Sequence, residues 1–240
     1  MARKKKKKRS SKSRPKKQQK HAAKRKQKHS RLARIRALFT SSPLARPPSL
    51  FDAASWPLHE VLISEDWRDP MTFTQILVVR KGPGGLYAVA AALVDQACLG
   101  VKTAFGRVVD KRDYRLLRSR MAANQVLIKS DINLAAKIIR ESVAYAHSFG
   151  INPDPDIGQT QILLRGADPD ACHEFIPLGG PGGKPIFIAG AYDNIPKITK
   201  TLEKHLGPDG FFVLLPAMDD VAFFDDEEFF DDEMVNDEDW

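Results

Sequence analysis

A carboxylate, a thiol and an amine lie close together near the middle of the chain. Asp95, Cys98 and Lys102 follow one another at spacings of three and four, at the end of an apolar run. Because a neighbouring charged group can activate a thiol, this spacing is compatible with a nucleophilic or acid–base site. No histidine stands near the thiol in sequence to accept its proton. The alternative is structural: Asp95 caps a turn, Cys98 packs in the core and Lys102 reaches solvent.

A second cluster contains residue types that bind metals. Cys172 and His173 are adjacent, and Asp168 and Asp170 precede them. Zinc sites usually carry two ligand pairs, such as C-x2-C with a second pair downstream, and this cluster has one adjacent pair. We therefore expect no metal site and no cofactor.

A glycine-rich loop invites comparison with phosphate-binding loops. Its sequence is Gly179-Gly-Pro-Gly-Gly-Lys184-Pro185. A Walker A loop has Gly five residues before its Gly-Lys pair, and Ser or Thr after the Lys. Leu178 and Pro185 occupy those two positions. The loop is therefore better interpreted as a hairpin turn.

The strongest chemical signal is a polybasic arm. Residues 1–51 hold 20 Lys and Arg and no Asp or Glu. A segment of this composition repels itself and is typical of an interaction tail. Each side chain that pairs with a phosphate releases a counterion, which predicts salt-sensitive binding to a polyanion. The predicted nucleic-acid-binding residues are Arg3, Lys4, Lys5, Lys6, Lys7, Lys8, Arg9, Lys12, Arg14, Lys16, Lys17, Lys20, Lys24, Arg25, Lys26, Lys28, Arg31, Arg34 and Arg36.

The arm predicts contact with phosphates rather than with bases. It has no aromatic residue before Phe39, so nothing in it can stack on an unpaired base. A nuclear localisation signal uses the same residue types and is one alternative. A membrane partner is not expected, because the first thirty residues show neither a lipidation motif nor an apolar face. RNA or a ribonucleoprotein is the predicted partner, with DNA as the second choice.

The other end of the chain has the opposite charge. Residues 219–240 hold 12 Asp and Glu and no Lys or Arg, whereas residues 52–218 hold 18 of each sign. The formal net charge of +8 therefore arises from the two ends. Five aromatic residues are interleaved with the acids: Phe223, Phe224, Phe229, Phe230 and Trp240. The acidic tail is expected either to mimic a nucleic acid and compete for the arm, or only to improve solubility.

These signals predict a non-catalytic nucleic-acid-binding protein. One alternative is an enzyme whose site contains Asp95, Cys98 and Lys102. Another is an adaptor whose acidic tail binds a basic partner. Two cysteines in unrelated contexts, and no apolar run long enough to span a bilayer, favour the cytoplasm, or the nucleus if the source is eukaryotic. The sequence leaves the oligomeric state open.

The segment from Leu93 to Ala104 carries a resemblance. Its sequence, Leu-Val-Asp-Gln-Ala-Cys-Leu-Gly-Val-Lys-Thr-Ala, is similar to the LVDxxCLGVKxA motif of a family of uncharacterised bacterial proteins. Further matches are Val79-Arg80, Ala144 to Gly150, Pro153 and Gly183-Lys184-Pro185. The resemblance spans roughly residues 60–215 and implies a shared α+β fold and a bacterial origin. It implies no activity. The chain departs from the family at Asn152 to Asp156, where His or Tyr is usual.

Two hairpins are predicted to position these residues. Apolar runs at residues 74–80 and 86–94 flank a turn of four residues that contains three glycines, which is typical of a hairpin buried on both faces. Runs at residues 175–178 and 185–189 flank the second glycine-rich loop and predict another hairpin.

Helical periodicity follows the first hairpin. Amphipathic patterns predict helices over residues 110–124 and 131–149, and a short helix is expected within 155–165. A further helix is expected to begin at Asn194 and to end at Gly207.

The predicted fold class is α+β: two or more hairpins packed with about three amphipathic helices. Further strands are expected at residues 105–109 and 211–215. Three regions are predicted along the chain. They are a disordered basic arm with a Pro-rich linker (1–48), a globular domain (49–218) and a disordered acidic tail (219–240).

Overall fold

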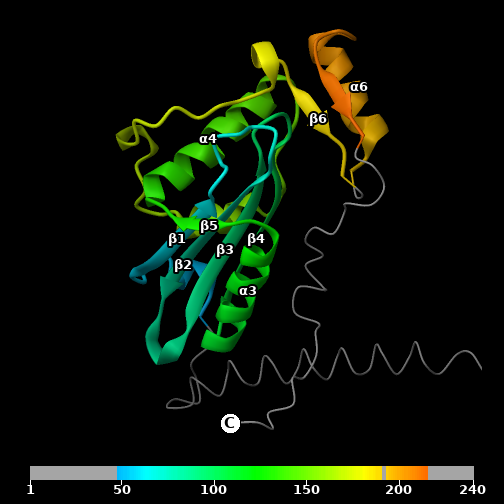
Figure 1. Ribbon diagram of the computed structural model, residues 1–240. Coiled ribbons are helices and arrows are strands. Elements are labelled where there is room, and N and C mark those ends of the chain that lie inside the picture. Colours follow the sequence, from blue (N-terminus) through cyan, green and yellow to red (C-terminus); the bar gives the residue numbers. More distant parts are fainter. Residues whose placement is uncertain (1–47, 191–192, 216–240) are drawn as a thin grey trace, which may run out of the picture. The chain divides into compact units, whose positions relative to one another are not determined.

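The computed structural model describes residues 48–190 and 193–215, and a five-stranded antiparallel sheet forms its centre (Figure 1). The strand order is β4-β3-β2-β1-β5. Consecutive strands from β1 to β4 pair with each other, so the sheet is built from local hairpins. The strands are β1 (Leu58–Ser64), β2 (Thr74–Lys81), β3 (Tyr87–Asp95), β4 (Gly100–Val109) and β5 (Leu127–Lys129).

The three longest helices begin where a side chain accepts a backbone amide hydrogen bond. Asp110, Asp131 and Asn194 do this for α3, α4 and α6. The helices are α2 (Leu50–Ala53), α3 (Lys111–Asn124), α4 (Ile132–Ser148), α5 (Ile157–Leu163) and α6 (Ile195–Leu206). Short 3-10 helices lie at Pro83–Gly85, Pro169–Ala171 and Pro181–Gly183.

Both faces of the sheet are buried, because successive side chains of a strand point to opposite faces. Ile76 and Val78 of β2 pack in a core with residues of α4 and α5. Leu77 and Val79 of the same strand pack in a second core with residues of α3. The sheet therefore has an α3 face and an α4 face, and each is covered by its own helices.

A small β-α-β unit completes the described part of the chain. Strands β6 (Ile186–Ile188) and β7 (Phe212–Leu214) are parallel and are connected through α6. Leu202 of α6 packs against Phe187 and Phe211 in a third core. A parallel pair of strands needs a crossover connection, and α6 supplies it.

The predicted hairpin between residues 175–178 and 185–189 is wrong. Residues 175–178 form no strand, and β6 pairs with β7 instead. The reason is a competing set of contacts with the β3–β4 turn. The side-chain amide of Gln96 donates to the Pro177 carbonyl at 2.9 Å, and the Gly179 amide donates to the Gln96 carbonyl at 2.9 Å.

The predicted α+β class is confirmed, as is the first hairpin, which corresponds to β2 and β3. The helices expected between residues 110 and 207 correspond to α3, α4, α5 and α6. Strands β1 and β5 were not predicted. The basic arm and the acidic tail lie outside the described residues, and the three-region division stays a prediction.

Candidate nucleic-acid interface

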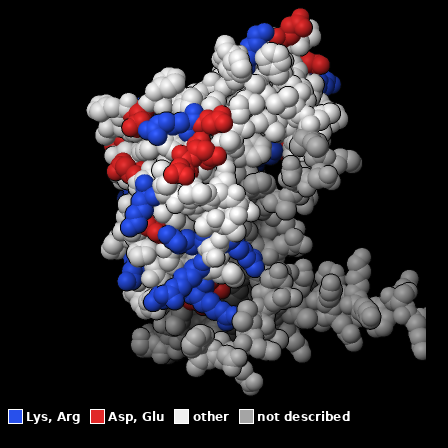
Figure 2. Space-filling view, in the orientation of Figure 1, with Lys and Arg blue, Asp and Glu red and all other residues white. Residues whose placement is uncertain are grey.

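The outer surface of α3 is rich in cations. Tyr114, Leu117 and Met121 recur at spacings of three and four and are buried against the sheet. Lys111, Arg112, Arg115 and Arg118 are therefore turned outward, and all four are exposed. Figure 2 shows Lys and Arg gathered in the lower half of the visible face, where Figure 1 places α3. We call these four residues the α3 basic surface.

An aromatic cluster supports one end of this surface. The ring of Tyr87 stacks on Tyr114 with centroids 4.6 Å apart, and the exposed ring of His59 packs edge-on against both. The Tyr114 hydroxyl donates to the carboxylate of Glu60. Burial, together with this hydrogen bond and the Glu60 charge, raises the pKa of Tyr114, so the phenol stays neutral. The cluster fixes the orientation of α3 on the sheet.

The cations of the α3 basic surface differ in how far they are neutralised. Arg118 Nε lies 3.2 Å from Glu60 Oε1, so one carboxylate already shares its charge. Asp113 is the one acid within α3, and its backbone amide donates to the side chain of the Asp110 cap at 2.9 Å. Lys111, Arg112 and Arg115 extend the exposed positive charge along the helix.

The α4 face is different, because the two cations of α4 itself are held by nearby oxygens. Arg140 Nη1 lies 2.8 Å from Asp170 Oδ1. Lys137 Nζ donates to the carbonyls of Cys172 and Glu174 at 2.9 and 2.7 Å. Figure 2 shows Asp and Glu gathered higher on the visible face, near α4. Positive charge on this face is therefore used within the protein.

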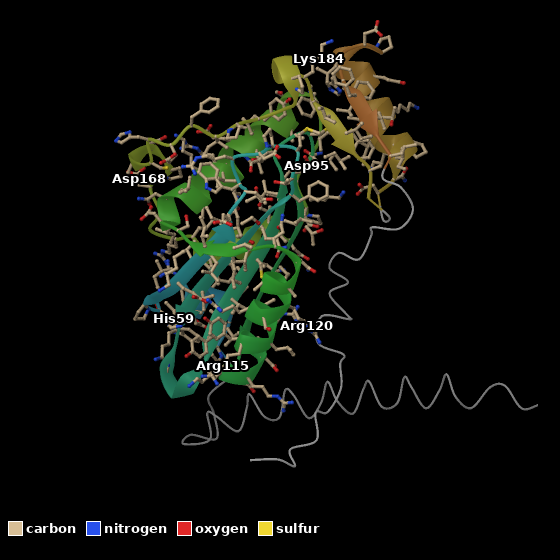
Figure 3. The ribbon with its side chains drawn as sticks, viewed as in Figure 1. His59, Asp95, Arg115, Arg120, Asp168 and Lys184 are labelled. Atoms are coloured by element: carbon tan, nitrogen blue, oxygen red, sulfur yellow. The ribbon has the colours of Figure 1, made fainter. Side chains whose placement is uncertain are left out.

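The residues of the polybasic arm, Arg3 to Arg36, all lie outside the described residues. Their predicted contact with nucleic acid stays a prediction. The candidate residues Asp95, Cys98 and Lys102 are described, and Asp95 lies at the far end of the sheet from Arg115 (Figure 3).

Asp95 is fully buried and closes the turn between β3 and β4. Its Oδ1 accepts hydrogen bonds from the amides of Ala97 and Cys98, each at 2.9 Å. Its Oδ2 has no hydrogen-bond partner within the described residues. Burial raises the pKa of Asp95 to about 6, although the amide hydrogen bonds and the nearby charge of Lys102 act in the opposite direction.

Cys98 and Lys102 are turned to other partners. Cys98 is buried in the third core, and burial together with the Asp95 charge raises the pKa of its thiol. The thiol therefore stays protonated at neutral pH, and a protonated thiol is a poor nucleophile. Lys102 Nζ pairs with Asp193 Oδ2 at 2.7 Å and lies 4.8 Å from the ring centroid of Phe73. These contacts favour the structural interpretation of the three residues.

The segment from Leu93 to Ala104 joins the sheet to α4 and to β6. Gly100 has φ +71°, and a Cβ there would lie 3.0 Å from the Ser142 carbonyl oxygen, so the turn packs closely on α4. The Ile186 amide donates to the Ala97 carbonyl at 3.0 Å, and Thr74 Oγ1 donates to Gln96 Oε1 at 2.7 Å. The spacing that suggested chemistry thus has a structural explanation, as a junction of three elements.

The glycine-rich loop uses its own amides. Gly180 donates to the Lys184 carbonyl at 2.8 Å, and Gly183 donates to the Gly180 carbonyl at 2.9 Å. Tyr145 closes the loop, because its hydroxyl donates to the Gly183 carbonyl at 3.1 Å. A phosphate would have to compete with these bonds.

The Cys172-His173 cluster is also accounted for by structural contacts. Asp168 caps the 3-10 helix at Pro169–Ala171 through the Asp170 amide, and Asp170 pairs with Arg140. Within residues 48–190 and 193–215, no group of three or more His, Cys, Asp and Glu is placed to hold a metal ion. A shallow hollow of about 300 Å³ lies beside this cluster and is lined mainly by α4 and α5 residues, with Asp95 not among them.

Sequence reasoning did not single out the α3 basic surface. The signal was present in the run Lys-Arg-Asp-Tyr-Arg-Leu-Leu-Arg, which begins at Lys111 and has one acid. It was hidden because the body as a whole holds equal numbers of acids and bases. Only the fold shows that the cations share one outer surface.

Comparison with known proteins adds no family. No family model, no curated protein and no solved structure matches the chain. The resemblance of Leu93–Ala104 to a bacterial motif therefore stays a prediction. In the part of the chain that the structure describes, no helix is long and apolar enough to cross a membrane.

Proposed function

We propose that this protein binds the phosphate backbone of RNA, without catalysis, through its polybasic arm and the α3 basic surface together. The observation that carries the proposal is the contrast between the two faces of the sheet. Cations are exposed along α3, whereas on the α4 face Lys137 and Arg140 are held by carbonyl and carboxylate oxygens. Exposed, weakly paired cations are the groups that can exchange counterions for phosphates.

The geometry of α3 suits a short stretch of backbone. At 1.5 Å rise per residue, Lys111 and Arg118 are about 10 Å apart along the helix axis. Guanidinium groups bind phosphate oxygens with two parallel hydrogen bonds, and three of the four cations are arginines. The arm would supply most of the affinity, because it holds many more cations.

The proposed mode reads charge and shape rather than base sequence. Phosphate contacts orient a protein on a nucleic acid but carry no direct sequence information. His59 is an exposed ring beside the α3 basic surface, and it is held by Tyr87 and Tyr114. A ribonucleoprotein would present the same phosphates, and duplex DNA is the second candidate. RNA and ribonucleoproteins occur in the cytoplasm, and the cytoplasm is therefore the proposed location of the protein.

A salt series tests the proposal. The full chain and a chain that begins at Ser49 would be titrated with a structured RNA, and in parallel with a DNA duplex of equal length. The slope of log affinity against log salt should change by about 0.7 to 0.9 for each phosphate that the shortened chain no longer neutralises, so its slope should be much flatter. A residual slope should persist in the shortened chain, because the α3 basic surface remains. Equal slopes for the two chains would contradict the role of the arm. Failure of the full chain to bind either nucleic acid at low salt would overturn the proposed function.

A further inference from the structure

Strand β1 contains one extra residue, and this residue is His59. The register of β1 on β2 shifts between Leu58 and Glu60, so His59 is left without a partner on β2. Side chains normally alternate between the two faces of a strand, which would place His59 on the face opposite to Glu60. Instead, both residues contact Tyr114 of α3. A β-bulge can re-aim a side chain, and this one turns His59 to the α3 face.

The ring of His59 is held in place but not covered. Tyr87 and Tyr114 are buried, and their ring centroids lie 5.3 and 5.8 Å from that of His59, at interplanar angles of 64° and 78°. The two tyrosine rings are stacked with centroids 4.6 Å apart, so both lie on one side of the imidazole. At least one flat face of the imidazole is therefore free of them, and His59 is exposed. A ring fixed by buried neighbours loses little freedom when a ligand stacks on it.

Cations of the α3 basic surface lie on both sides of this ring. Tyr114, the residue of α3 that contacts His59, has Lys111 three residues before it and Arg118 four residues after it. Residues at these spacings lie on the same side of a helix. Arg118 also reaches strand β1, because its Nε lies 3.2 Å from Glu60 Oε1. A base stacked on His59 would therefore have a cation about one helical turn away on either side to receive its flanking phosphates.

We propose that His59 stacks on an unpaired base of the bound RNA, so that the folded body favours single-stranded segments over a continuous duplex; this inference rests on the proposed function. His59 and Arg115 lie at the same end of the sheet, so one RNA strand can meet the ring and the cations together (Figure 3). Aromatic side chains, histidine among them, stack on bases that have left the helical stack. Such stacking tolerates any base, because every base has a π-face. The ring therefore adds a preference for unpaired structure without sequence specificity.

The bulge also has a purely structural explanation. Strand β5 pairs with β1 at residues 62–64, so within the described residues the other edge of β1 has no strand partner at residues 58–60. A bulge at an open edge discourages pairing with a strand of another chain. That role needs the extra residue but no ring, and it predicts no effect of position 59 on RNA binding. Variants of the ring therefore separate the two explanations.

Binding of the full chain to two RNAs tests the proposal. One is a short oligouridylate, whose bases stack weakly on one another, and the other is an RNA duplex of the same length. His59→Ala should weaken binding to the oligouridylate about fivefold or more and leave binding to the duplex unchanged. His59→Phe keeps an aromatic ring and should retain most of the affinity for the oligouridylate. His147→Ala removes an exposed histidine of α4 and is the matched control, with no change expected for either RNA.

Proton NMR of the parent chain follows the ring directly. The His59 ring protons are assigned by their absence from the spectrum of His59→Ala. They should shift upfield when the oligouridylate is added, because a base stacked on the ring shields them. This measurement does not depend on the stability of any variant, and thermal unfolding would check that each variant keeps the fold.

A loss of affinity that is confined to the oligouridylate, absent in His59→Phe and accompanied by the upfield shift, supports the proposal. Unchanged oligouridylate binding by His59→Ala, an equal loss for both RNAs, or ring protons that do not shift on binding would each overturn it. In those three cases the full chain still binds RNA, and the proposed function stands. If the full chain binds neither RNA at low salt, the stacking proposal and the proposed function both fail.

Discussion

The two faces of the central sheet differ in charge, although the folded body is neutral as a whole. Residues 103–129, which include most of β4 and all of α3 and β5, hold seven Lys and Arg and two acids. Residues 130–174, which include α4 and α5, hold three Lys and Arg and seven acids. Net charge is therefore a poor guide to the partners of a domain, because it hides how the charges are segregated.

The faces also differ in what their polar groups do. On the α3 face, cationic side chains are exposed and can exchange their counterions for phosphates. On the α4 side, and at the β3–β4 turn next to it, polar groups join elements: Asp95 closes a turn, Gln96 holds residue 177, and Lys102 pairs with Asp193. We therefore expect substitutions on α3 to change binding without changing stability, and substitutions at the turn to do the reverse.

The largest expected effect is on the α3 side. Reversal of three exposed cations, Lys111→Glu, Arg112→Glu and Arg115→Glu together, should weaken binding to structured RNA at least about tenfold and reduce the salt slope by about 2 to 3. The matched control reverses three exposed lysines of α6: Lys197→Glu, Lys200→Glu and Lys204→Glu. Both triple variants change the net charge equally. If both weaken binding to the same extent, net charge rather than the α3 basic surface is responsible.

The next effect concerns pH and the turn. Burial raises the pKa of Asp95 from 3.8 to about 6, so between these values the folded state holds a proton that the unfolded state has released. The free energy of unfolding should therefore fall as the pH rises from about 4 to about 6 and then level off, by on the order of 3 kcal/mol at most. The side chain introduced by Asp95→Asn cannot titrate, so this variant should lack the part of the decline in the free energy of unfolding that Asp95 causes.

Denaturant unfolding at several pH values between 4 and 7 would measure this contribution. Asp209→Asn, at an exposed position, is the control and should keep the decline. A constant stability difference between Asp95→Asn and the parent chain across this window would contradict the assignment. Both variants should bind RNA like the parent chain at neutral pH, once folded.

A smaller decrease in stability is expected at Cys98. Cys98→Ser places a hydroxyl in the third core and should lower the free energy of unfolding by roughly 1 to 3 kcal/mol. Cys172→Ser is the control, because Cys172 is only partly buried. RNA binding should not change in either variant. Rapid modification of Cys98 by a thiol reagent in the native protein would instead indicate an accessible thiolate and would support the enzyme alternative.

The sequence predicted the elements whose signals are local. The hairpin of β2 and β3 has long apolar runs on both sides of a glycine-rich turn, and α4 and α6 have a cap, a stripe and a terminal glycine. Strand β1 was missed because His59 and Glu60 interrupt its apolar pattern. These two side chains contact Tyr114 of α3, which no local pattern reveals.

Non-local competition explains the errors. The apolar residues 175–178 have the composition of a strand, but the β3–β4 turn binds their backbone instead. The three residues that suggested a reactive site, at positions 95, 98 and 102, are close in sequence but turn to different partners. Spacing along the chain could not show this, because the partners of Cys98 and Lys102 come from distant segments.

The smallest expected effect concerns the acidic tail. Residues 219–240 can neutralise part of the arm whenever the two come within about 8 Å, the Debye length at physiological ionic strength. Truncation after Met218 should therefore tighten binding to random RNA a few-fold at about 50 mM salt, and the gain should shrink as salt rises. Truncation after Phe224 removes ten of the 12 acids but keeps residues 221–224. It should give most of the same gain, because most of the competing charge lies beyond Phe224. If neither truncation tightens binding at low salt, the acidic tail does not compete with nucleic acid for the arm. The charge dependence of binding by the folded body would then be explained by the contrast between the two faces of the sheet alone.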